Sequence, residues 1–154
     1  MSAPNPIYPA ASAGKLEEVL RLTIAHFHAD TGTIHLLEAD GVLHLKAASD
    51  GIPEPILKAV ELVPIGKGMA GLAVERKQPV SVCNLQTDAS GNARPGAKAT
   101  GMEGALVVPI LLGEKAVGAI GIANRKPRTF TPQETAELIN IGRAIALAKD
   151  SQHL

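Results

Sequence analysis

Apolar side chains recur at a helical spacing near both ends of the chain. Over residues 15–29 they fall every three or four positions, which predicts an amphipathic helix. A second stripe of this kind begins just after Thr131. Thr131 is a favourable N-cap, Pro132 suits the first helical position, and Glu134 would complete a capping box. The pattern therefore predicts one helix near each end of the chain.

The pair Asp40-Gly41 separates two strand-like segments and is a strong hairpin signal. A two-residue turn at this pair would set Leu36 opposite Leu45, and Glu38 opposite Leu43. That register predicts one strand face carrying Ile34, Leu36, Leu43, Leu45 and Ala47, and another carrying His35, Leu37, His44 and Lys46.

The strongest strand pair comes later in the chain. Residues 105–112 and 115–124 are long apolar runs joined at Gly113-Glu114, which predicts a second hairpin. Shorter elements are expected between the two hairpins: helices over 53–60 and 69–76, and strands over 62–65 and 79–82. Because hairpins dominate, we expect an α+β fold with a mostly antiparallel sheet and the terminal helices packed on one face.

The order of elements predicts one structural unit. A length of 154 residues suits a single domain with one core. We assign residues 1–14, which contain three prolines, to a flexible N-terminal arm. Residues 15–150 form the domain, and residues 151–154 are a C-terminal tail.

Composition narrows the classes of function. Hydrophobic residues make up 45% of the chain and charged residues 19%, as in a globular domain. The 15 basic and 15 acidic residues give a formal net charge of zero, which argues against a nucleic-acid partner. Neither a membrane-spanning run nor a signal-peptide pattern is evident, so we expect a cytoplasmic protein. Aromatic residues are only 2%, which argues against a flat stacked cofactor, and we expect none.

The segment GKGMAG, residues 66–71, is the main candidate for a binding site. Lys67 is not followed by the Ser or Thr of a Walker loop, and no parallel strand–helix–strand unit surrounds the segment. It nevertheless opens a helix, whose first N–H groups attract an anion. The alternative is that its glycines only permit a tight turn and close packing. The candidate ligand-binding residues here are Gly68, Met69, Ala70 and Gly71.

Residues 84–104 form a long polar, glycine-rich segment of the kind that often serves as a lid or binding loop. Arg94 and Lys98 could close over a ligand from this segment. Cys83 precedes it and would lie at the mouth of the site. As the only cysteine, Cys83 cannot form an intrachain disulfide, and a buried cysteine is more often inert than reactive.

His35 and Leu37 share the face of the first strand that could line the same site. In the expected register His44 lies on this face too, on a diagonal from His35. No third ligand accompanies the two histidines, so we expect no metal site.

Two segments carry a resemblance to a known family. "VPIGKGMAGLAVERKQPVSVCNLQTD" and "GALVVPILLGEKAVGAIGIANRKPRTFTPQETAELINIGRAIA" resemble a GAF domain, as does the first hairpin. The resemblance covers about residues 15–149. It implies a roughly six-stranded antiparallel sheet with terminal helices on one face. On the other face it implies a ligand pocket roofed by short helices and the long loop. GAF domains bind cyclic nucleotides, bilins, haem, amino or oxo acids and small anions, so the family does not name the ligand.

The resemblance leaves several functions open. Stand-alone nitrate receptors of this family hold the anion at a helix N-terminus and tune a histidine kinase, and this chain offers such a helix at Met69 and Ala70. Free methionine-R-sulfoxide reductases carry a cysteine where Ala70 stands and another in the long loop, which argues against this enzyme. A third reading is a ligand-free dimerisation module.

These alternatives lead to one expectation. We expect a non-enzymatic cytoplasmic sensor that binds a small molecule, with nitrate as the best single ligand. We also expect a homodimer that regulates a partner protein such as a histidine kinase.

Overall fold

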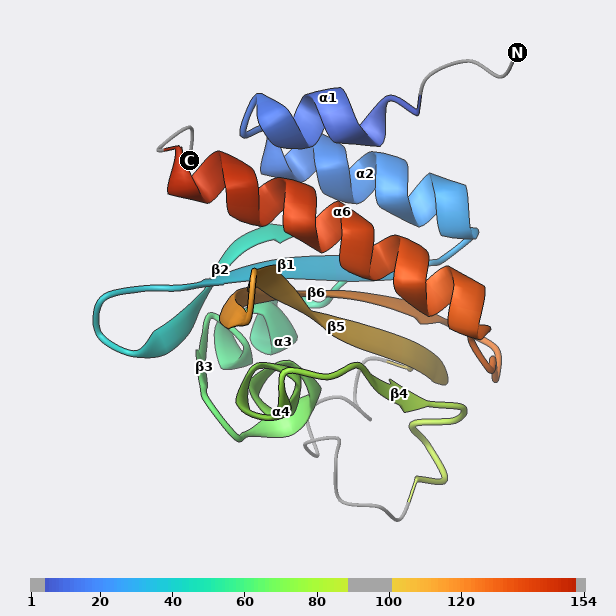
Figure 1. Cartoon of the computed structure of the whole chain (residues 1–154). Coiled ribbons are helices and arrows are strands. Elements are labelled where there is room, and N and C mark those ends of the chain that lie inside the picture. Colours follow the sequence, from blue (N-terminus) through green and yellow to red (C-terminus); the bar gives the residue numbers. More distant parts are fainter. Residues whose placement is uncertain (1–4, 89–100, 152–154) are drawn as a thin grey trace.

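The computed structural model describes residues 5–88 and 101–151, and three layers make up this part of the chain (Figure 1). One layer holds the helices α1 (Ile7–Ser12), α2 (Leu16–Phe27) and α6 (Pro132–Asp150). The middle layer is a sheet, and the third holds the short helices α3 (Glu54–Ala59) and α4 (Gly68–Arg76). The strands are β1 (Thr31–Leu37), β2 (Val42–Ala48), β3 (Leu62–Pro64), β4 (Val80–Val82), β5 (Gly104–Leu112) and β6 (Lys115–Asn124).

The sheet has six strands in the order β3-β2-β1-β6-β5-β4, and all neighbouring strands are antiparallel. The expected α+β fold is therefore confirmed, with a long helix from each end of the sequence on the same face of the sheet. The predicted capping box of α6 is present: Glu134 N donates to Thr131 Oγ1 at 3.0 Å, and Thr131 N donates to Glu134 Oε1 at 2.9 Å.

The predicted register of the first hairpin is wrong by one residue between the turn and a bulge after Ile34, whereas Ile34 pairs with Ala47 in the predicted register. Gly41 N donates to the Glu38 carbonyl at 3.0 Å, and Glu38 N donates to the Val42 carbonyl at 3.1 Å. The turn therefore has three residues, with Gly41 in the left-handed region at φ +77°. In consequence, Leu37 pairs with Leu43.

This shift also moves His44 to the other face of the sheet. Leu36 pairs with His44, whereas His35 pairs with Leu45 across a bulge that follows Ile34. Cross-strand partners share a face, so His35 and His44 lie on opposite faces rather than on one diagonal. Such a one-residue slip exchanges the two faces of a strand.

The expectation that residues 1–14 form a flexible arm is wrong for the part of this segment that the structure describes. Residues Ile7–Ser12 form α1, which packs against α2 and α6. Ile7 is 1% exposed and Ala11 is fully buried, so this segment belongs to the core. The apolar spacing of the short helix was hidden by Pro6 and Pro9, which its first turn accommodates.

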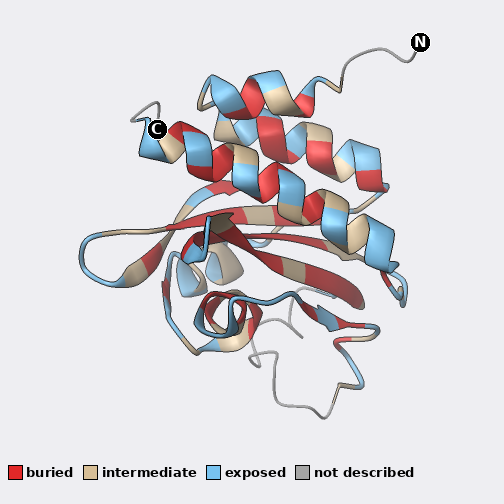
Figure 2. Cartoon of the chain, in the orientation of Figure 1, coloured by how far each residue is buried: buried red, intermediate tan, exposed pale blue. Residues whose placement is uncertain are grey.

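Most residues of the central strands are buried (Figure 2), but the two faces of the sheet differ in the size of their side chains. The face toward α1, α2 and α6, which we call the helix face, carries large side chains of β5 and β6 that contribute to one apolar cluster. They include Leu106, Val108, Ile110, Ile120 and Ile122, all at most 2% exposed. The opposite face, which we call the cavity face, carries Ala105, Val107, Ala119, Gly121 and Ala123 from the same two strands.

No helix in the described part of the chain is long and apolar enough to cross a membrane.

Candidate functional site

A cavity of about 340 Å³ lies between the cavity face of the sheet and the short helices α3 and α4. Its floor includes Ala105, Gly121 and Ala123, whose small side chains leave space above β5 and β6. Ile56 and Val60 contribute to its roof from the α3 segment. A volume near 300 Å³ is at the small end of the range for organic ligand sites.

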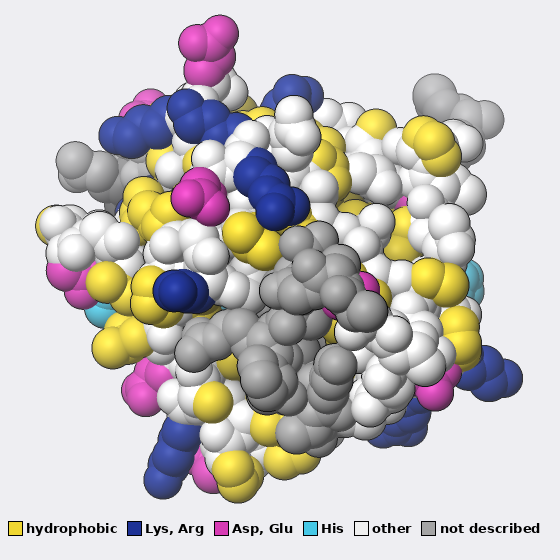
Figure 3. Space-filling model, turned by 90° about the horizontal axis from the view of Figure 1, so that it is seen from below, with side chains coloured by type: hydrophobic (Ala, Val, Ile, Leu, Met, Phe, Trp, Pro, Cys, Tyr) yellow, Lys and Arg dark blue, Asp and Glu magenta, His cyan; other side chains and the backbone are white. Residues whose placement is uncertain are grey.

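Figure 3 shows the surface of the molecule on this side. Lysine and arginine side chains are interspersed with aspartate and glutamate, and hydrophobic side chains lie between them. The visible face therefore carries no extended charge of one sign that would favour a nucleic acid.

The start of α4 forms one wall of the cavity. Gly66 and Gly68 have φ +87° and +64°, in the left-handed region that favours glycine, and they turn the chain from β3 into the helix. Gly68, Met69 and Ala70 occupy the first turn of α4, and all three line the cavity. The N–H groups of this turn have no acceptor within the helix, and the helix dipole makes this end positive. The wall can therefore bind an anionic or hydrogen-bond-accepting group.

Gly71 holds this wall in place without lining the cavity. Gly66 N donates to the Gly71 carbonyl at 2.9 Å. A Cβ on Gly71 would lie only 2.4 Å from the Pro64 carbonyl oxygen, so the close approach of α4 to the end of β3 requires glycine here. Among the predicted ligand-binding residues, Gly71 is thus a packing residue.

His35 is a buried polar group in the cavity lining, with an exposed fraction of 3%. Its Nε2 lies 2.8 Å from the Val60 carbonyl oxygen, which can only accept, so Nε2 carries the proton. Nδ1 is then an acceptor, and it is buried without a hydrogen-bond partner in the described structure. Burial lowers the pKa of His35, although the hydrogen bond to Val60 opposes this shift. The ring is therefore neutral at pH 7 and ties β1 to the end of α3.

The polar groups of the cavity favour an anionic or neutral ligand. Lys67 is the one charged residue in the described lining, and it is the N-cap residue of α4. Thr31 and Thr33 add hydroxyl groups from β1. No carboxylate is among the described lining residues, so a ligand anion would meet a cation and helix N–H groups without acidic repulsion.

The remaining predicted site residues do not join the described lining. Leu37 shares a face with His35 but packs with the cluster of Leu43 and Val63. Cys83 is exposed after β4, and its Sγ lies 3.6 Å from Thr129 Oγ1. Arg94 and Lys98 lie outside the described residues. The described residues contain no group of three or more potential metal-ligating side chains.

Sequence reasoning missed most of the cavity floor. Alternation of residue size along β6 could have revealed part of it, because Ile120 and Ile122 occupy one face, and Ala119, Gly121 and Ala123 the other. The contribution of the α3 segment through Ile52, Pro53 and Ile56 had no such signal, because it depends on how α3 folds back over the sheet.

A family model described as GAF domain matches residues 15–149. No curated protein sequence matches. The resemblance to a GAF domain is thereby supported, whereas the likeness to nitrate receptors within that family is not.

Three solved structures share the fold at low sequence identity. The GAF domain of an Acinetobacter phosphoenolpyruvate-protein phosphotransferase has a TM-score of 0.79 and 18% identity, over 96% of this chain and 90% of that one. A Neisseria meningitidis free methionine-R-sulfoxide reductase in complex with its substrate has a TM-score of 0.74 and 13% identity, over 97% and 93%. A domain of a putative two-component sensor histidine kinase from Sinorhizobium meliloti has a TM-score of 0.65 and 18% identity, over 99% and 93%.

Proposed function

Since the chain belongs to the GAF domain family, a small-molecule sensor and regulatory fold, we propose that it binds a small organic anion in its cavity. The observation that supports this proposal is that the cavity combines a polar wall with an apolar floor and a volume suited to a small organic molecule. The first turn of α4 and Lys67 supply positive potential, and an apolar floor of about the right size for a small organic body lies beside them.

The size of the cavity bears on the choice between an inorganic anion and an organic one. A volume of about 340 Å³ is roughly ten times the ~30 Å³ that one water takes up in the liquid. Nitrate would fill only a small part of it, against walls formed by residues such as Ile56, Val60 and Met102. A carboxylate with an aliphatic body would use both the polar wall and the apolar floor. Nitrate remains among the ligands to be tested.

The proposed activity is regulatory rather than catalytic. Reduction of a sulfoxide by a thiol requires a thiolate at the ligand and usually a second cysteine. The exposed position of Cys83, outside the described cavity lining, supports the proposal that this chain does not perform that reaction, despite the fold it shares with such reductases. The partner would be a signalling protein, and a histidine kinase remains our candidate.

One observation favours a second role as an interaction module. Leu147, in the last turn of α6, is 62% exposed and offers a large aliphatic side chain on the outer surface of that helix. A homodimer formed through α6 would cover it. In that role the chain would associate whether or not the cavity is occupied.

A thermal-shift titration of the full chain tests the proposal. The probes are nitrate, chloride, sulfate, a series of short aliphatic carboxylates and 2-oxo acids, cyclic nucleotides and methionine sulfoxide. A ligand of the native state raises the melting temperature in a saturable way. We expect the rise with an aliphatic carboxylate or 2-oxo acid. A rise only with nitrate would mean that the ligand is an inorganic anion rather than an organic one. A flat response to every probe would contradict ligand binding.

A matched pair of variants locates the binding group. Ala70→Pro removes one N–H group from the first turn of α4, where proline is tolerated, whereas Ala70→Ser keeps that N–H. We expect Ala70→Pro to lower the apparent affinity obtained from the titration by about tenfold or more, as for loss of a hydrogen bond to a charged group. Ala70→Ser should retain it.

A further inference from the structure

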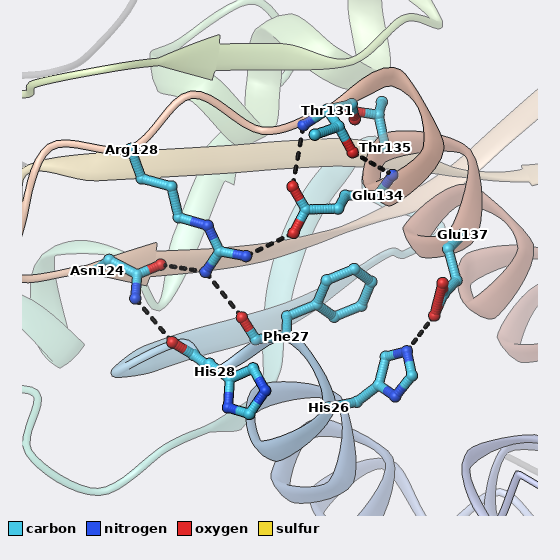
Figure 4. Close-up of polar contacts among 9 residues, drawn as sticks. All are labelled: His26, Phe27, His28, Asn124, Arg128, Thr131, Glu134, Thr135 and Glu137. Carbon is cyan, nitrogen blue, oxygen red and sulfur yellow. Dashed lines mark hydrogen bonds and ion pairs between the residues drawn. The ribbon is translucent and has the colours of Figure 1, made fainter.

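We propose that Arg128 couples occupancy of the cavity to the helices on the opposite face of the sheet, at the last turn of α2 and the first turn of α6. The inference rests on the proposed function only in that the cavity takes a ligand. Arg128 belongs to the connection between β6 and α6, and its side chain lies beside Asn124 at the C-terminal end of β6 (Figure 4).

The Arg128 guanidinium joins three elements. Its Nη1 donates to the carbonyl oxygen of Phe27, the last residue of α2, at 2.7 Å, and to Asn124 Oδ1 in β6 at 2.9 Å. Its Nη2 donates to Glu134 Oε2 in the first turn of α6 at 2.6 Å. The guanidinium carbon also lies 4.3 Å from the centre of the Phe130 ring. A single side chain thus fixes the end of one helix against the start of another.

The charges of Arg128 and Glu134 complement the dipoles of the two helices that they connect. The guanidinium lies at the negative C-terminal end of α2, and the Glu134 carboxylate lies at the positive N-terminal end of α6. The backbone N–H of Thr131, together with the Arg128 guanidinium, lowers the pKa of the Glu134 carboxyl. Removing the guanidinium would therefore leave the carboxylate in its capping box but disconnect it from α2.

The same connection is hydrogen-bonded to the wall of the cavity. Leu85, Met102 and Ala123 all line the cavity. Leu85 N donates to the Glu103 carbonyl at 2.6 Å, and Glu103 N donates to the Asn124 carbonyl at 2.7 Å. A ligand that displaces the Leu85 or Met102 side chain therefore moves backbone that is bonded to Asn124, whose side chain holds Arg128.

The backbone of Arg128 is held just as closely. Arg128 N donates to the Cys83 carbonyl at 3.0 Å, and Gly104 N donates to the Lys126 carbonyl at 3.1 Å. A Cβ on Gly104 would lie 2.7 Å from the Arg128 Cβ, so the two segments are in direct contact. A packed contact of this kind transmits small displacements of β5 to Arg128.

An engineered side chain can replace the unidentified ligand in the test. Ala105→Leu replaces a methyl group with an isobutyl group, which enters the cavity from β5. Backbone hydrogen exchange, resolved by NMR on the full chain, then reports on the last turn of α2 and the first turn of α6. We expect Ala105→Leu to change exchange rates in both turns by about threefold or more. Ala105→Val serves if Ala105→Leu does not fold.

The role of Arg128 is tested in combination with that variant. In Arg128→Gln, and in Arg128→Lys, which keeps the charge but loses the fork, the effect of Ala105→Leu on both turns should vanish. Thr131→Ala is the matched control, because it weakens the first turn of α6 through its cap but leaves all groups that contact the guanidinium in place. In Thr131→Ala the response should persist.

Two results would overturn the proposal: no response of the helix turns to Ala105→Leu, or an equal response in the presence and absence of Arg128. Failure of every small molecule to bind would contradict the proposed function alone, because this test uses no ligand.

Discussion

The helix face and the cavity face of the sheet are formed by the same strands, yet one is solid and the other is hollow. On the helix face, isoleucine and leucine side chains of β5 and β6 meet α2 and α6 in a continuous apolar cluster. On the cavity face, Ala105, Gly121 and Ala123 leave about 340 Å³ beneath short helices. A single strand can therefore stabilise the core with large side chains on one face and leave room for a ligand with small side chains on the other. A large side chain would fill the space that a ligand would otherwise occupy.

The largest difference between the faces should appear when a large side chain is shortened. Ile120 is fully buried on the helix face, so Ile120→Ala should lower the free energy of unfolding by about 2–5 kcal/mol, through lost transfer energy and a new cavity. Val107→Ala borders a cavity that already exists and should cost only about 1–2 kcal/mol. Urea denaturation of both variants measures the two values, and equal losses would contradict the distinction between the faces.

The same substitution, glycine to alanine, should have different effects in the helices that cover the two faces, α4 and α6. Gly71→Ala in α4 would bring Cβ to 2.4 Å from the Pro64 carbonyl oxygen, and we expect a loss of about 1–3 kcal/mol as α4 is pushed away. Gly142→Ala in α6 meets its nearest atom at 3.5 Å and should be neutral or stabilising by up to about 1 kcal/mol. Thermal unfolding of both variants tests this, and a stable Gly71→Ala would show that α4 is not held by this contact.

The cavity face should also respond to pH through His35. Its pKa is lowered in the folded protein, mainly by burial, so the unfolded chain binds a proton first as pH falls below about 6.5. Stability from the neutral ring is therefore complete above that value and is lost on acidification, with a slope of at most about 1.4 kcal/mol per pH unit. In His35→Gln, the free energy of unfolding should therefore depend less on pH than in the wild type between about pH 7.5 and 5.5.

His28→Asn is a suitable control for the His35 variant. His28 is exposed and has φ +54°, a conformation that asparagine tolerates. The control should keep the pH dependence of the wild type. If His35→Gln also keeps it, the buried ring is not its source.

The smallest effect is expected at Cys83. Because this side chain is exposed and outside the described lining, Cys83→Ser should change the free energy of unfolding by less than about 0.5 kcal/mol. It should also leave the thermal shift given by any ligand unchanged. Loss of binding, or of a sulfoxide-reducing activity, on this substitution would place the thiol in the site and favour the enzymatic reading.

Local sequence patterns predicted most of the fold. The spacing of apolar residues gave the two long helices, and the runs that flank Gly113 gave the central hairpin, because these signals depend only on neighbouring residues. The register at Asp40-Gly41 failed because the same dipeptide serves two- and three-residue turns. Helix α1 was missed because its burial depends in large part on α6, which comes from the other end of the sequence.

The candidate site was predictable only in part. The glycines before α4 marked its polar wall, and His35 followed from the alternation of β1. The contacts of Arg128 with Phe27 and Glu134 join residues from three elements, and no periodicity in the sequence indicates them. Long-range contacts of this kind depend on the assembled fold.

The most direct test of the account compares one substitution on each face. Ala105→Leu points into the cavity, and Ala146→Leu enters the packed cluster beneath α6, where Ala146 is fully buried. We expect the free energy of unfolding of Ala105→Leu to stay within about 1 kcal/mol of the wild type, and that of Ala146→Leu to fall by about 1–3 kcal/mol or more by overpacking. Equal destabilisation of the two variants would mean that no ligand-sized space exists on the cavity face, and would contradict the account.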